Sequence, residues 1–180
     1  MDIMHMLVSR IGFSVLVLAL VSSAQAATTT GQFTSSMTLS SSCQINGAGG
    51  TSGVNFGTLD FGSTGSLFTT ANGEVLAGGG GALSILCSSG TLPTVTVGAG
   101  NNDGGSVGGT RALTDGSTNF VPYDLYTDSG RTQVLAIGGV IALAESTGVA
   151  QTVNIYGKAV GKAGLPAGTY SDSVAVELTF

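Results

Sequence analysis

Short runs of alternating apolar and polar residues recur along the chain after residue 26, separated by clusters of Gly, Asn and Asp. Side chains of an extended strand alternate between two faces, so this pattern predicts β-strands. No window combines a 3.6-residue apolar period with helix-capping residues. Many short strands at this spacing are typical of a β-sandwich or a β-barrel. Strands are expected near residues 31–40, 54–61, 82–88, 94–98, 121–127, 132–137, 152–159 and 171–180.

The segments between the expected strands have the composition of turns and loops. Asp-Ser-Gly at residues 128–130 predicts a tight hairpin turn, and Arg131 just after it predicts a weak surface ion pair with Asp128. No internal repeat or long linker divides the chain, so a single folded domain is expected. Glycine-rich loops without the Lys-Ser or Lys-Thr pair of a phosphate-binding loop are expected at residues 46–53, 78–81 and 98–109.

The clearest alternation lies at the two ends of the chain. One face of the N-terminal strand would carry Phe33, Ser35, Met37 and Leu39, with Thr and Ser on the opposite face. One face of the C-terminal strand would carry Val174, Val176, Leu178 and Phe180. Taken alone, this pattern also fits ordinary terminal strands of a closed sandwich.

Residues 1–26 have the features of a secretory signal peptide. Arg10 precedes an apolar run at residues 11–21, which is shorter than the roughly 20 residues that a membrane span needs. Small residues at Ala24 and Ala26 form the expected cleavage site. We therefore expect a mature chain that begins at Ala27, leaves the cytoplasm and spans no membrane.

Charge and composition exclude several functions. The expected cleavage removes the single histidine, His5, and leaves a net charge of −5, because the removed segment contains one acid and one base. Nucleic acid is not an expected partner of such a chain, since phosphate binding needs clustered Lys and Arg. The remaining basic residues are scattered through the chain: Arg111, Arg131, Lys158 and Lys162.

Catalytic, metal and cofactor sites are not expected. Acid–base pairs could come from Asp124 with Asp128, or from Asp172 with Glu177, but carboxylates in such strands and turns are usually exposed and solvated. A calcium site at residues 101–104 is a weaker alternative than a polar turn, because no bidentate glutamate follows. We therefore predict a protein that is not an enzyme and binds no cofactor.

Cys43 and Cys87 are the two cysteines of the chain. In an oxidising compartment an isolated pair most often forms one disulfide, which is our prediction. The rival interpretation is a thiol nucleophile, but the mature chain has no histidine to activate it.

Several segments together resemble the spore coat protein U domain family, which includes subunits of archaic, Csu-type chaperone–usher pili. The resemblance covers nearly the whole mature chain and is specific in the order and spacing of its motifs. They are Thr-Gly-Gln at 30–32, Phe-Gly-Thr-Leu-Asp-Phe-Gly at 56–62, Tyr-Asp-Leu-Tyr-Thr-Asp at 123–128, Arg-Thr at 131–132, Ile-Tyr-Gly-Lys at 155–158 and Pro-Ala-Gly-Thr-Tyr-Ser-Asp at 166–172.

The resemblance implies an all-β, incomplete immunoglobulin-like sandwich at residues 41–180, completed by donor-strand exchange through an extension at residues 27–40. Phe33, Met37 and Leu39 match the family's donor positions; Ser35 departs from the pattern, because a larger apolar residue is usual there. The C-terminal strand matches the segment that borders the acceptor groove and meets the chaperone.

The same resemblance implies a function and partners. The chain would be a pilus subunit that travels through the periplasm to the cell surface and supports adhesion and biofilm formation. Its implied partners are a periplasmic chaperone, an outer-membrane usher and other copies of itself or related pilins. The alternatives are a secreted binding module such as a tip adhesin, and a spore-coat or matrix protein with a complete sandwich.

Overall fold

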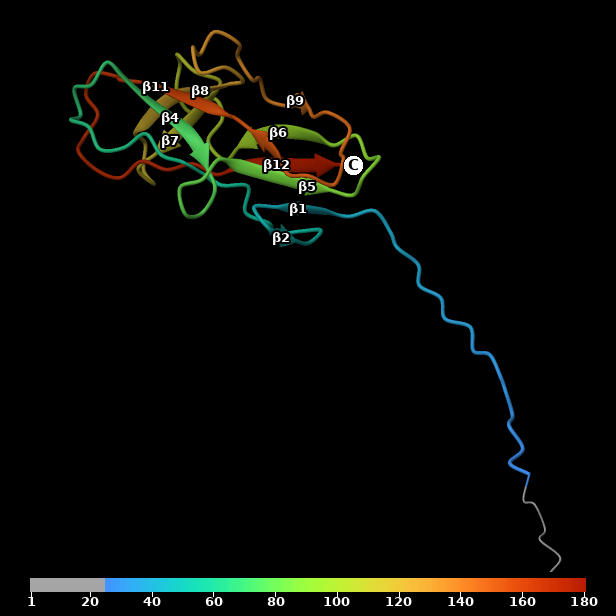
Figure 1. Ribbon diagram of the computed structural model, residues 1–180. Coiled ribbons are helices and arrows are strands. Elements are labelled where there is room, and N and C mark those ends of the chain that lie inside the picture. Colours follow the sequence, from blue (N-terminus) through green and yellow to red (C-terminus); the bar gives the residue numbers. More distant parts are fainter. Residues whose placement is uncertain (1–24) are drawn as a thin grey trace, which may run out of the picture. The chain divides into compact units, whose positions relative to one another are not determined.

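The computed structural model describes residues 25–180, where all strand pairs are antiparallel and no helix is assigned (Figure 1). The all-β prediction is confirmed. The strands are β1 (Cys43–Ile45), β2 (Ala48–Gly49), β3 (Thr58–Leu59), β4 (Thr70–Leu76), β5 (Leu83–Cys87), β6 (Thr94–Gly100), β7 (Arg111–Thr114), β8 (Phe120–Tyr126), β9 (Gly139–Ala142), β10 (Gln151–Val153), β11 (Tyr156–Val160) and β12 (Val174–Thr179).

The strands of this described region form three sheets, with the orders β10-β5-β1-β2, β3-β4-β11-β8-β7 and β12-β6-β9. The core is built from alternate positions of these sheets, as the sequence pattern predicts. In β5, Leu83 and Ile85 are 0% and 1% exposed, and in β6 Val95 and Val97 are 0% and 1% exposed. They belong to one apolar cluster that also contains residues of β8, β10 and β11. Burial of each such side chain contributes about 1.5–3 kcal/mol.

The strand expected at residues 132–137 does not form. Only an isolated bridge is present there, at Val134. The Asp128 carboxylate accepts hydrogen bonds from the backbone N–H groups of Thr132, at 2.9 Å, and Gln133, at 2.7 Å. Side-chain acceptors of this kind compete with a strand ladder for backbone donors. The prediction of a strand was wrong for this reason.

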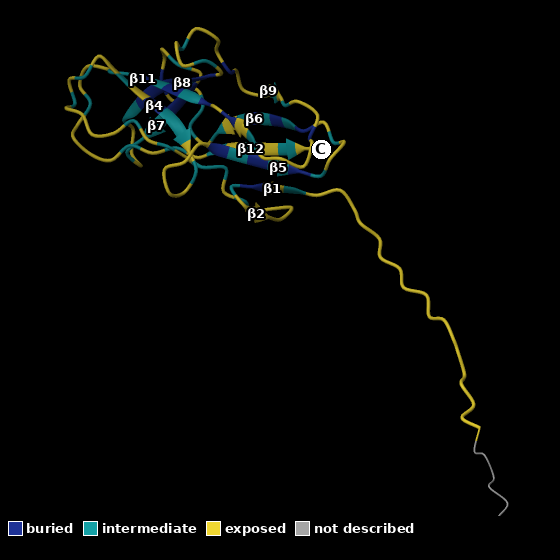
Figure 2. Cartoon of the chain, in the orientation of Figure 1, coloured by how far each residue is buried: buried dark blue, intermediate teal, exposed yellow. Residues whose placement is uncertain are grey.

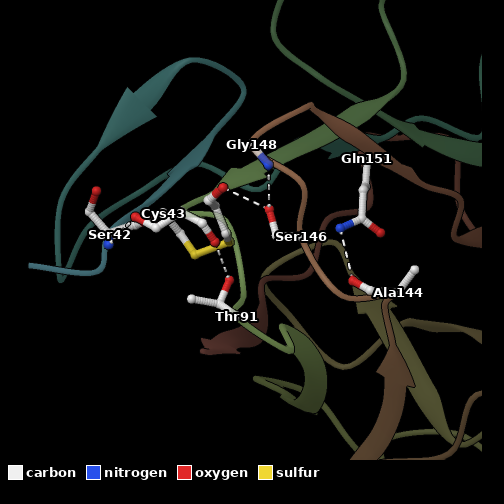
Figure 3. The surroundings of a disulfide bond; sticks show 9 residues. Ser42, Cys43, Thr91, Ala144, Ser146, Gly148 and Gln151 are labelled. Carbon is white, nitrogen blue, oxygen red and sulfur yellow. Dashed lines mark hydrogen bonds between the residues drawn. A yellow bond between two sulfur atoms is a disulfide. The ribbon is translucent and has the colours of Figure 1, made fainter.

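The disulfide prediction is confirmed. Cys43 and Cys87 are joined by a disulfide and are register partners in the pairing of β1 with β5 (Figure 3). Ser146, which is 2% exposed, donates its hydroxyl to the Cys87 carbonyl at 2.7 Å. The covalent bond therefore ties the short strand β1 to a strand of the core.

Residues 39–180 form one compact unit, and residues 25–38 belong to a separate one. The expected signal peptide lies almost entirely outside the described residues. Between residues 25 and 42 no strand is assigned, although one was expected at 31–40. Phe33 is 92% exposed and Met37 82% exposed. No helix in the described part of the chain is long and apolar enough to cross a membrane.

Candidate functional site

An open cleft of about 420 Å³ lies within the unit formed by residues 39–180. One wall is the start of β12 and the residues just before it, and the other wall is the segment at residues 54–61. The floor consists of core side chains from β5, β6, β7 and β8. The lining is Val54, Asn55, Phe56, Gly57, Thr58, Leu59, Phe61, Val75, Leu83, Val97, Leu113, Tyr123, Leu125, Ile155, Asp172, Ser173, Val174 and Val176.

The wall formed by β12 is an unpaired sheet edge. Among the described strands β12 pairs only with β6, so its other edge has no strand partner. Val176 and Leu178 face Val97 and Val95 in this register, but they are only half-buried, whereas both β6 valines are fully buried. The inner face of β12 therefore has the composition of a core strand without the cover that a core strand receives.

The opposite wall is shaped by a repeated Asx-Phe-Gly unit, at residues 55–57 and again at 60–62. In each unit the Asx side chain accepts a hydrogen bond from the backbone N–H of the glycine two residues later, at 2.8 Å for the first unit and 2.7 Å for the second. Both glycines have positive φ, +125° and +72°, which other residues rarely adopt. These turns direct Phe56 and Phe61 onto the core, where they line the cleft.

This wall packs against the sheet through two glycines that face each other, Gly73 of β4 and Gly157 of β11. A Cβ at Gly73 would lie 2.5 Å from the Asp60 carbonyl oxygen, and a Cβ at Gly157 would lie 2.7 Å from a methyl group of Leu59. The absence of side chains at both positions is therefore what lets the segment approach the sheet. Arg131 donates to the carbonyl oxygens of the same two glycines, at 3.1 and 2.9 Å.

We expect Gly73→Ala to destabilise the fold by about 1–3 kcal/mol, because the new methyl group would meet backbone rather than a movable side chain. Urea unfolding of the purified mature chain measures the change. Gly168→Ala is the matched control, since nothing lies within 4 Å of a Cβ there. Equal unfolding midpoints for the two variants would contradict this account of the wall.

The polar end of the cleft is a hydrogen-bonded group around Asp172. Tyr123 donates its hydroxyl to Asp172 Oδ2 at 2.8 Å, and the backbone N–H of Asn101 and the side-chain amide of Asn102 donate to Oδ1 at 3.0 and 2.9 Å. Asp172 is thus not the solvated carboxylate expected from the sequence. Burial, followed by the hydrogen bond to Asp172, raises the pKa of the Tyr123 phenol far above its usual value.

We expect the Tyr123→Phe variant to lose less stability than the wild type as the pH becomes alkaline. The pKa of Tyr123 is higher in the folded chain than in the unfolded chain, where it is about 10, so the unfolded chain releases this proton first. The free energy of unfolding therefore falls as the pH rises above about 10. Urea midpoints between about pH 8 and 11 measure the slope for wild type and variant. Identical slopes would show that the hydroxyl is not held in its neutral form.

Two further expectations concerned ionic groups. The pairing of Arg131 with Asp128 was wrong: Arg131 binds backbone carbonyls, while Asp128 accepts from Thr132 and Gln133. The amide of Gln133 is the main cause that lowers the pKa of the Asp128 carboxyl. Among residues 25–180 no three His, Cys, Asp or Glu side chains are grouped in a way that could hold a metal ion.

Of the site residues predicted from the sequence, Val174 and Val176 line the cleft. Leu178 lies further along the same face of β12, and Phe180 is 51% exposed at the chain end. At the other end, Phe33, Ser35, Met37 and Leu39 are all exposed. The sequence analysis did not identify the second wall of the cleft, which is formed by Val54, Phe56, Leu59 and Phe61. The repeated Asx-Phe-Gly unit was the signal that could have identified it.

Comparison with known proteins agrees with the resemblance seen in the sequence. The Spore Coat Protein U domain family matches residues 29–177. Protein U of Myxococcus xanthus is 30% identical over 169 residues, covering 88% of this chain and 89% of that protein. A chain in the crystal structure of the CsuC–CsuE chaperone–tip adhesion subunit pre-assembly complex, from archaic chaperone–usher Csu pili of Acinetobacter baumannii, is 25% identical with a TM-score of 0.48. That match covers 79% of this chain but spans only 40% of the length of the other. The protein is a member of the Spore Coat Protein U domain family.

Proposed function

We propose that the chain is a structural, non-enzymatic subunit of a chaperone–usher surface pilus, and that a strand from the next subunit completes its sandwich. The observation that carries this proposal is the open cleft, with apolar core side chains in its floor, beside the unpaired edge of β12. An open apolar groove next to free backbone donors and acceptors is a template for an added strand. Membership of the Spore Coat Protein U domain family supports the same conclusion, since the sequence resemblance extends to archaic pilus subunits.

The donor is the segment at residues 33–39 of another copy. Its alternation places Phe33, Met37 and Leu39 on one face, which suits a strand laid over an apolar floor. Burial of these three side chains would contribute roughly 1.5–3 kcal/mol each, or about 5–9 kcal/mol together. Ladder hydrogen bonds to the edge of β12 would add about 0.5–1.5 kcal/mol each. Such a joint would be comparable to the net stability of a whole domain, about 5–15 kcal/mol.

Ser35 is the small polar member of the donor face and buries the least apolar area. A donor with one such position either leaves a shallow place at which an incoming strand can start to bind, or makes a weaker joint. Donation from one copy to the next is a heterologous contact, which continues as an open filament instead of closing into a dimer.

Assembly of this kind requires protection of the cleft before the donor arrives. We propose that a periplasmic chaperone occupies the C-terminal strand, through Val174, Val176, Leu178 and Phe180, and that an outer-membrane usher exchanges it for the donor. The filament would lie on the cell surface and support adhesion and biofilm formation. A tip adhesin or a matrix protein is the competing function, and neither requires head-to-tail exchange of strands between copies of this chain.

A denaturing gel of material sheared from the cell surface tests the proposal. Donor-strand joints as stable as estimated above should survive the detergent at room temperature and fail on boiling. We expect a ladder of bands in the unheated sample and one band of about 15 kDa after boiling, the mass of the chain without residues 1–26. A single band before heating would contradict polymerisation by strand donation.

A further inference from the structure

β9 is a second unpaired edge, on the side of its sheet opposite to β12. In the described part of the chain it pairs only with β6. The backbone N–H of Leu143 donates to the Pro93 carbonyl at 3.0 Å, which continues the same register. Hydrogen-bonded and non-hydrogen-bonded residue pairs alternate along an antiparallel ladder. Since Leu143 bonds to Pro93, the pairs Thr94–Ala142 and Thr96–Val140 are not hydrogen-bonded, so Val140 and Ala142 point their backbone N–H and C=O groups away from β6. These groups form a short free edge.

The side chains around this edge lack the usual protection against pairing. Residues 132–144 contain no charged side chain and no proline. Val134, Ile137 and Val140 are 55%, 46% and 58% exposed, and Figure 2 shows β9 among exposed residues. Natural sheets usually block an exposed edge with Lys, Pro, a bulge or an inward charge. None of these is present in β9, so the edge is open to another strand over the four residues of β9.

The distribution of charge favours a second copy of the chain as the partner. The whole chain carries a net charge of −5, so two copies repel each other over most of their surface. At the uncharged segment of residues 132–144, two copies can approach each other without this electrostatic repulsion. The segment also has no charged side chain that would attract a basic or acidic partner. Two-fold pairing would place Val140 of one copy close to Val140 of the other, and such isologous contacts are the commonest in homo-oligomers.

We propose that β9 is a self-association surface, at which two copies of the chain pair edge to edge in antiparallel orientation. This contact uses the opposite edge of the sheet from the cleft and does not depend on the proposed strand donation. One copy can therefore engage both edges at once. In a filament the same contact would join neighbouring filaments side by side.

Sedimentation velocity of the mature chain carrying Met37→Asp tests the inference, because that change is designed to stop strand donation. We expect a monomer–dimer equilibrium, with a dissociation constant raised at least tenfold by adding Val140→Lys. Val107→Lys is the matched control, since Val107 is 87% exposed outside any strand. A chain that stays monomeric at all concentrations, or an equal effect of the two lysines, would overturn the proposal.

Amide hydrogen exchange gives a second, independent reading. The Val140 and Ala142 amides should exchange more slowly in concentrated samples than in dilute ones. If the Met37→Asp variant still forms long polymers, the donor assignment fails. The role of β9 can still be decided in that case, by measuring the exchange rates of the same two amides in the polymers. Unprotected Val140 and Ala142 amides in any associated state would overturn self-association at this edge.

Discussion

Cells that express only the Met37→Asp variant are expected to assemble no filament while still exporting the subunit. Met37 lies in the middle of the proposed donor face, from which its side chain would meet the apolar floor of the cleft. The substitution removes roughly 1.5–3 kcal/mol of apolar burial and places a carboxylate where no basic group lines the site. Electron microscopy of the cell surface and the periplasmic level of the subunit measure the two effects.

Thr38→Asp provides the matched control for this experiment. This substitution adds one negative charge, as Met37→Asp does. Thr38, however, lies on the opposite face of an extended strand, where the new carboxylate would stay in water. We expect filaments of near-normal number in that variant. Normal filaments with Met37→Asp, or equal loss in both variants, would contradict the donor assignment.

Cys43→Ser is expected to lower the amount of folded subunit strongly. The disulfide to Cys87 closes a loop with a sequence separation of 44 residues, for which the chain-entropy relation gives about 4 kcal/mol. That is a large part of the net stability of a typical domain, about 5–15 kcal/mol. The bond also holds the three-residue strand β1, which follows the proposed donor segment in the sequence.

Urea unfolding and the periplasmic level of the subunit would report this loss. The double variant Cys43→Ser/Cys87→Ser separates loss of the bond from the effect of one unpaired thiol, and both variants should lose stability similarly. Ser42→Ala, next to the bond on an exposed residue, is expected to change little. Wild-type levels of assembled filaments in Cys43→Ser would show that the bond is dispensable.

Strands with clean alternation could be predicted from the sequence. β5, β6, β8 and β12 appear where it placed them, because their inward positions carry Val, Leu, Ile or Tyr at every second residue. β4 was missed, since Asn72 and Gly73 interrupt its pattern, and the reason for Gly73 is the close approach of a distant segment. β9 was also missed, because Gly139 to Ala142 are all apolar or small and do not alternate.

One half of the candidate site was predictable and the other half was not. Val174 and Val176 belong to an alternating strand, so their shared face follows from local geometry. The opposite wall is built by turns, in which Asn55 and Asp60 bond to backbone N–H groups and point Phe56 and Phe61 inward. Its place on the sheet depends on the close approach of Leu59 to Gly157, 98 positions later in the sequence, which no local pattern encodes.

Binding of a donor peptide to the Met37→Asp mature chain tests the central claim most directly. The peptide covers residues 31–41, and the same peptide with Met37→Asp is its control. At a concentration about 100 times the dissociation constant, binding to the folded state adds about 2.7 kcal/mol, which raises the Tm by roughly 5–10 °C for a chain of this size. We predict that rise with the wild-type peptide and none with the control. An unchanged Tm with the wild-type peptide at millimolar concentration would contradict the claim that the cleft accepts this segment.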